Sequence, residues 1–183
     1  MNVVPLQLKG ISQFIGNDDL ALLELVTDDG LKQLAVVCEG TMIRQFGLRL
    51  SDVPIRHKLL PEVLWTALGG EKKEKMSVLF SDFHEGEYIV FLCDEELDKR
   101  WPIRASDAVL LATVAKLPMA AEQRVMERCA APVDTSGKGV VMPMALLPTE
   151  LLRKELEKAI AREDYEKASH LRDELKKRDS QPS

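Results

Sequence analysis

The stretch that decides the fold is residues 101–119, WPIRASDAVLLATVAKLPM. In it a short polar cluster, residues 104–108, runs directly into apolar residues at helical spacing. We expect Ser106 or Asp107 to cap this helix, because its first backbone N–H groups lack partners within the helix. Pro118 is expected to end it. A charged cluster at the start of a buried helix is costly unless its members pair or bind a ligand, so it is either a structural lock or a site.

Before this stretch, the sequence predicts a sheet built from two β-hairpins. Strand-like runs flank two turn signals, Asp28-Asp29-Gly30 and His84-Glu85-Gly86. The expected fold class is therefore α+β, with a mostly antiparallel sheet, packed helices and a C-terminal helical hairpin. The expected strands cover residues 3–12, 20–27, 31–38, 75–83 and 87–93.

Apolar residues at a period of 3.6 predict helices between and after these hairpins. The second helix has an apolar face at this period, although Pro61 leaves its exact start open, and Gly69-Gly70 ends it. That face consists of Leu59, Leu60, Val63, Leu64 and Ala67. The expected helices cover residues 40–50, 56–68, 104–117 and 120–129.

The chain changes character after residue 130, where the first domain is expected to end. Residues 131–147 have the Pro and Gly content of a linker, and their apolar end, 140–147, suits an edge strand or extended arm. Residues 148–178 predict two short helices, with Asp164 capping the second, and 179–183 are expected to be a disordered tail. Two such helices bury little surface alone, so we expect the hairpin to pack against a second copy, another protein or its own domain.

Composition favours a soluble globular protein. The 183 residues are 45% hydrophobic and 30% charged, and no apolar run reaches the roughly 18–20 residues of a membrane helix. The N-terminus lacks signal-peptide features, so a cytoplasmic location without membrane contact is expected. Three cysteines without CxxC spacing argue against a disulfide framework or a zinc site.

The charge is unevenly distributed. Residues 1–150 carry 16 basic and 22 acidic side chains, whereas residues 151–178 carry nine and seven. An acidic body disfavours broad binding of nucleic-acid backbones, although a small local site is compatible with it. No nucleotide-binding motif occurs, so no nucleotide cofactor is expected.

Two resemblances to known families are carried by short motifs. The first set of motifs is Lys9-Gly-Ile-Ser12, Leu34-Ala-Val-Val37, Pro54-Ile-Arg-His-Lys-Leu-Leu60, Asp82-Phe-His-Glu-Gly-Glu-Tyr88 and Ile103-Arg-Ala-Ser-Asp-Ala108 with Pro118. Through these motifs, residues of about 3–129 resemble the bifunctional nuclease domain family, also called domain-of-unknown-function family 151. The second set, in the tail, is Leu156-Glu-Lys-Ala-Ile-Ala161, Asp164-Tyr-Glu-Lys-Ala168 and Leu171-Arg-Asp-Glu-Leu175. Through it the tail resembles the UvrB/UvrC-type (UVR) motif.

The first resemblance implies an α+β domain that tends to dimerise and has RNase and DNase activity. The second implies a protein–protein contact made by a helical hairpin, as between nucleotide-excision-repair components. The chain departs from the nuclease pattern at Met42, where the family has an acid, and at residues 53–58, where an Arg and an Asp are missing and His57 is kept. These losses suit a divergent, non-catalytic member.

A nuclease site is conceivable from the residues that are kept. His57 is the candidate general base, Arg104 and Ser106 the candidate phosphate contacts, and Asp107 the candidate to orient the histidine. Asp82 and Asp107 are the candidate ligands for Mg²⁺ or Mn²⁺. The site is coherent only if His57 meets the 104–107 cluster. In the structural alternative, these residues only cap helices and form ion pairs.

Two functions follow. One is a metal-dependent nuclease acting on RNA or single-stranded DNA. The other is a non-catalytic adaptor, a homodimer or higher homo-oligomer, that recruits a protein partner through its tail. The candidate partner-binding residues of the tail are Leu156, Ile160, Tyr165, Ala168, Leu171 and Arg172.

Overall fold

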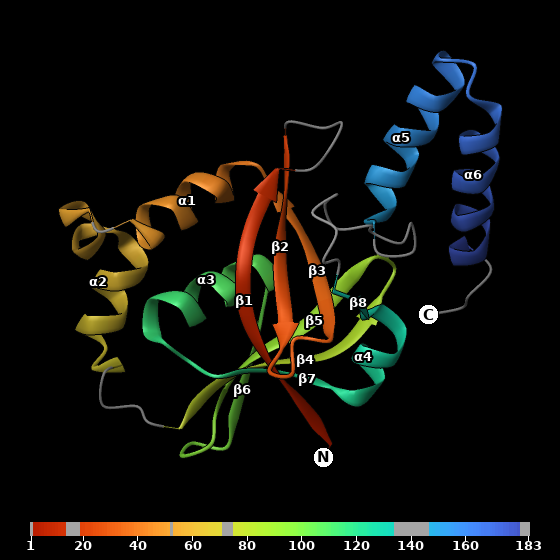
Figure 1. Ribbon diagram of the computed structural model, residues 1–183. Helices are drawn as coiled ribbons and strands as arrows, with labels where there is room; N and C mark the ends of the chain where they lie inside the picture. Colours follow the sequence, from red (N-terminus) through yellow and green to blue (C-terminus); the bar gives the residue numbers. More distant parts are fainter. Residues whose placement is uncertain (1, 14–18, 52, 71–74, 134–146, 180–183) are drawn as a thin grey trace.

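The computed structural model describes residues 2–13, 19–51, 53–70, 75–133 and 147–179. These residues form a sheet with the strand order β6-β5-β4-β7-β1-β2-β3-β8, covered by helices (Figure 1). The strands are β1 (Val3–Gln13), β2 (Leu20–Thr27), β3 (Lys32–Glu39), β4 (Met76–His84), β5 (Glu87–Asp94), β6 (Lys99–Ile103), β7 (Met119–Glu122) and β8 (Ala131–Pro132). The helices are α1 (Thr41–Leu50), the 3₁₀ helix η1 (Pro54–Lys58), α2 (Leu60–Ala67), α3 (Ala105–Ala115), α4 (Gln123–Cys129), α5 (Thr149–Ala161) and α6 (Tyr165–Asp179).

The α+β fold and both predicted hairpins are confirmed. β2–β3 and β4–β5 are antiparallel pairs, and within the described sheet only β4 and β7 run parallel. The tight turn at Gly30, with φ of 68°, suits glycine because it has no Cβ to clash there.

The predicted helix over 120–129 is wrong in its first half. Residues Met119–Glu122 form β7, which lies between β1 and β4 and pairs with both, and the helix begins at Gln123. Alanine-rich sequence favours a helix locally, but two flanking strands outweigh that weak preference. Part of the predicted linker also joins the sheet, since β8 pairs with β3. The expected arm over 140–147 lies outside the described residues except for Leu147.

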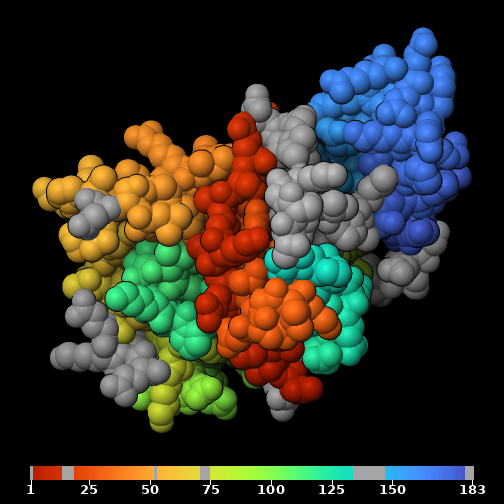
Figure 2. Space-filling view, viewed as in Figure 1, coloured from red at the N-terminus to blue at the C-terminus, as the bar shows by residue number. Residues whose placement is uncertain are grey.

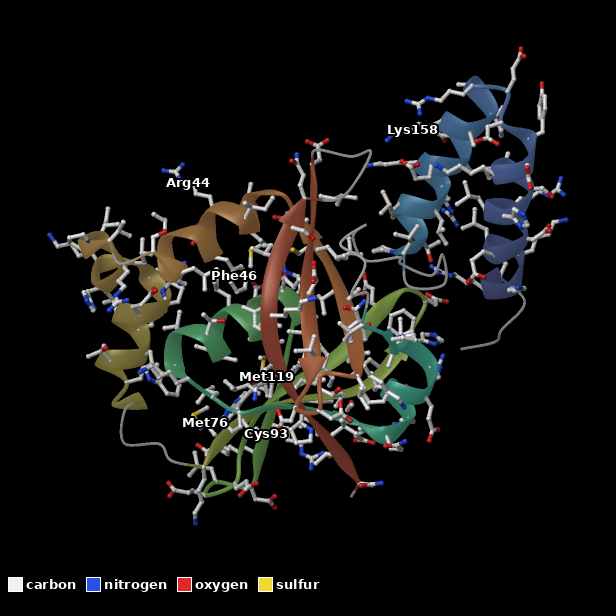
Figure 3. All side chains as sticks on the ribbon, in the orientation of Figure 1. Arg44, Phe46, Met76, Cys93, Met119 and Lys158 are labelled. Atoms are coloured by element: carbon white, nitrogen blue, oxygen red, sulfur yellow. The ribbon has the colours of Figure 1, made fainter. Side chains whose placement is uncertain are left out.

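The sheet curls around helix α3. The Tyr88 hydroxyl on β5 donates a hydrogen bond to the Ala35 carbonyl oxygen on β3 at 3.1 Å, although four strands separate these two in the sheet. Ala108 and Val109 of α3 are fully buried inside this curl. Phe46 of α1 is also fully buried, between α1 and α3 (Figure 3).

The helix predicted over 56–68 is two elements, η1 and α2, with Pro61 in the first turn of α2. α3 ends at Ala115, before the expected stop at Pro118, because Lys116 adopts a left-handed conformation with φ of 53°. Among the described residues, no helix is long and apolar enough to cross a membrane.

The predicted C-terminal helical hairpin is confirmed as α5 and α6. It stands at one end of the molecule, with α1 and α2 at the other (Figure 2). Asp164 caps α6, as expected, by accepting a hydrogen bond from the Lys167 backbone N–H at 3.1 Å. The hairpin has its own apolar core, which also contacts Leu20 and Val37 of the sheet.

Candidate functional site

The start of α3 brings several polar side chains together, but its cap differs from the prediction. Arg104, with an extended backbone, occupies the N-cap position, and no side chain there hydrogen-bonds a free backbone N–H. Neither Ser106 nor Asp107 is the cap, because both lie inside the first turn. The free N–H groups of this turn therefore face the space in front of the helix.

Arg104 holds two carboxylates. Its guanidinium donates to both oxygens of Asp107, at 3.0 and 3.3 Å, and to Glu39 at the end of β3, at 3.0 Å. The hydrogen bonds to Asp107 are the main reason that the pKa of Arg104 is raised. The three side chains are about half exposed, so these ion pairs add little stability and mainly orient the groups.

A cavity of about 630 Å³ opens in front of this helix start. Ser106 lines it and is only 4% exposed. Cys38 lines it too, but burial raises the pKa of this thiol to about 11, so it is not a reactive thiolate at neutral pH. Glu39 and Glu87 add negative charge to the lining.

His57 does not join this cavity. It is exposed on η1 and lines a separate cavity together with residues 114–118, at the opposite end of α3. An eleven-residue helix spans about 16 Å, so His57 and the 104–107 cluster do not meet. The predicted nuclease site required His57 to lie beside the 104–107 cluster, and the structure does not place it there.

Asp82, the other predicted metal ligand, does not lie with Asp107 but pairs with arginines of α4. Its carboxylate accepts hydrogen bonds or ion pairs from Arg124 and Arg128 of α4, both at 3.3 Å, and from the Phe83 backbone N–H at 2.8 Å. Asp107 is held instead by Arg104. Among the described residues, no three His, Cys, Asp or Glu side chains are grouped closely enough to hold a metal ion.

The hairpin is attached to the sheet by a polar contact that the sequence did not reveal. Arg178 is 8% exposed in its side chain, and its Nη1 donates to the carbonyl oxygens of Leu147 and Glu85 at 2.8 and 3.2 Å, and to the Thr149 hydroxyl at 3.0 Å. Gly86, with φ of 88°, lies against this contact, and a Cβ there would strike Leu147 and Pro148. The sequence analysis identified Gly86 as part of a hairpin turn, but no sequence pattern pointed to Arg178.

The predicted partner-binding residues of the hairpin divide into two groups. Ala168 and Leu171 are buried between α5 and α6, and Leu156 is half-buried, so these residues hold the two helices together. Ile160 and Tyr165, near the turn between the helices, are 55% and 70% exposed. Arg172 is also exposed.

Comparison with known families identifies one part of the chain. Residues 149–179 match the UvrB/uvrC motif, UVR, and this range is the α5–α6 hairpin. A search of the curated proteins finds no match.

Proposed function

We propose that this protein is an adaptor that recruits a protein partner through the α5–α6 hairpin. The observation that carries the proposal is the match of the whole hairpin to the UVR motif. The hairpin buries its own apolar core and is anchored at its base by Arg178. The turn between α5 and α6 is therefore held in place before a partner binds. This lowers the conformational entropy that is lost on binding.

The turn end of the hairpin offers the contact residues. Tyr165 and Ile160 are the large apolar side chains exposed there, and aromatic residues are frequent anchors of protein interfaces. Arg162 and Arg172 are exposed on the same hairpin and supply charge for partner selection.

The test is capture of partners by the purified full-length protein. We expect the variant Tyr165→Glu/Ile160→Glu to lose a partner that the wild type binds. Arg44→Glu is the matched control, because Arg44 is exposed on α1 at the other end of the molecule (Figure 3). Equal capture by all three proteins would refute the adaptor proposal.

A second candidate, the metal-dependent nuclease, is favoured by the cavity at the start of α3. A phosphate there would meet free backbone N–H groups, Ser106 and Arg104. Mg²⁺ or Mn²⁺ would be held by Glu39, which lines the cavity, and by Asp107, which shares the Arg104 guanidinium with Glu39, and would activate water. Both carboxylates already accept hydrogen bonds from Arg104, and the surplus of acids opposes a polyanion, so this function ranks second.

Cleavage assays decide this second candidate. Labelled RNA and single-stranded DNA are incubated with the purified protein and Mg²⁺, Mn²⁺ or EDTA, beside Asp107→Asn. Metal-dependent cleavage that the variant lacks would establish the nuclease. No cleavage, or equal cleavage by the variant, would dismiss this site.

A further inference from the structure

Helix α2 presents apolar side chains to solvent. Leu60, Leu64 and Leu68 follow one another at four-residue spacing, and these residues are 69%, 49% and 73% exposed. α2 has no buried residue at all. Full burial of a leucine is worth about 1.5–3 kcal/mol, so within one chain this helix forgoes most of the stabilisation its sequence offers.

A groove runs beside this ridge of leucines. It encloses about 330 Å³ between α2 and the β5–β6 edge, and nearly all of its lining is apolar. Leu64 and Leu68 form one wall, and Leu92 and Trp101, paired across β5 and β6, belong to the other. A two-fold axis placed between the ridge and the groove would set the ridge of each copy over the groove of the other, so this surface has the layout that a two-fold pairing of identical copies requires.

We propose that this surface is the interface between two copies of the chain. We call it the α2 face and define it as Leu60, Val63, Leu64, Leu68 and Trp101, each at least 40% exposed. From these exposed fractions, together they expose on the order of 500 Å² of mostly apolar surface. A partner in a standard interface contributes about 800 Å², of which about 65% is apolar in homodimers, so the area matches what a stable dimer needs.

The charges at the two ends of the α2 face support a two-fold arrangement. Arg56 and Lys58 of η1 stand before α2. Past the Trp101 end, the turn at residues 95–98 carries three exposed acids, which outnumber the neighbouring cations Lys99 and Arg100. An antiparallel pairing of two copies places the basic end of each against the acidic end of the other, which favours this register.

The interface leaves both hairpins accessible, because they lie at the other end of each copy (Figure 2). The dimer presents two α5–α6 hairpins, so a partner with two hairpin sites is held more tightly than by a single copy. The inference about the α2 face does not depend on this consequence or on the proposed function.

Sedimentation equilibrium of the full chain over a concentration series tests the proposal. The wild type is expected to be a dimer, and Leu64→Glu to weaken dimerisation at least about 100-fold, because it buries an unpaired charge in the interface. Leu31→Glu is the matched control, because Leu31 is another exposed leucine, in the turn between β2 and β3, and this variant is expected to dimerise normally. Circular dichroism checks that each variant is folded.

Exchanging the charges at the two ends of the α2 face tests the antiparallel register of the two copies. It also tests the proposal itself if Leu64→Glu fails to fold. Lys58→Glu and Glu95→Lys are each expected to weaken the dimer several-fold, and the double variant to restore it. A monomeric wild type at every concentration, or a dimer that Leu64→Glu and both charge variants leave unchanged, overturns the proposal. A dimer lost only in Leu31→Glu overturns it as well, because the interface would then lie at the β2–β3 turn.

Discussion

The two ends of the molecule each carry a helix with an apolar stripe, which is buried at one end and exposed at the other. In the α5–α6 hairpin the stripe is buried, with Leu152 and Leu171 at 0% and 1% exposure. In α2 a stripe of similar composition and spacing is left in water. Periodicity therefore predicts that a helix has an apolar face, but it does not tell which surface covers that face.

The difference arises from what each helix finds nearby. α5 and α6 have each other, and Leu20 and Val37 of the sheet close their core. α2 contacts α3, whose own apolar surface is already enclosed by the curled sheet. The sequence left open whether the hairpin packs against a second copy, another protein or its own domain, and the structure shows a contact with its own domain at Leu20 and Val37. The leucines of α2 have no such cover within the described residues.

The largest contrast is expected from one substitution made at both ends. Leu171→Ala removes a fully buried side chain and should destabilise the hairpin by about 2–4 kcal/mol, because a cavity remains. Leu64→Ala, measured at a dilution where the protein is monomeric, should cost less than about 1 kcal/mol, because that side chain is already half exposed. Hydrogen exchange of α5–α6 and of α2 measures both, and equal costs would remove the contrast.

Gly86→Ala is the next largest test, because it acts only where the hairpin meets the sheet. The positive φ strains alanine, and its Cβ would collide with Leu147 and Pro148. We expect a loss of about 1–3 kcal/mol in hairpin protection against hydrogen exchange. Gly30→Ala is the control, because φ is also positive there but the added Cβ has no neighbour within 4 Å. It should leave the α5–α6 hairpin unaffected.

Arg178→Ala should have a smaller effect. It removes the hydrogen bonds to the carbonyl oxygens of Leu147 and Glu85 and to the Thr149 hydroxyl, together with the ion pair to Glu174. We expect the hairpin to lose about 1–2 kcal/mol of stability. Faster exchange at the base of α5 and the end of α6, with α2 unchanged, is the expected result. Unchanged exchange in the hairpin would mean that its apolar core alone anchors it.

The smallest effect is a dependence of hairpin stability on pH. Burial by itself raises the pKa of Glu155, but hydrogen bonds from Lys158 and Lys167 outweigh it and hold the pKa below its ordinary 4.5. The stabilisation is therefore complete above pH 4.5 and is lost as the pH falls through the lower folded-state value. The thermal unfolding temperature should fall between pH 6 and pH 3. In Glu155→Gln this fall should be smaller, because the part that comes from protonating Glu155 is absent.

The candidate site shows how far local pattern reaches. The sequence placed Arg104, Ser106 and Asp107 together at the start of a helix, because residues within one helical turn are neighbours whatever the rest of the fold does. It offered no means of finding that Glu39 completes the cluster, or that His57 lies at the far end of the same helix. Those relations depend on long-range packing, which local spacing does not encode.

By itself, the sequence determined the class of the fold, its two hairpins, the existence of most helices and the paired helices of the tail. These follow from periodicity and turn chemistry, which act over a few residues. Only the tertiary structure decided that residues 119–122 become a strand, because β1 and β4 supply hydrogen bonds on both sides. It also decided which apolar stripe is covered, because burial depends on surfaces that residues far away in the chain provide.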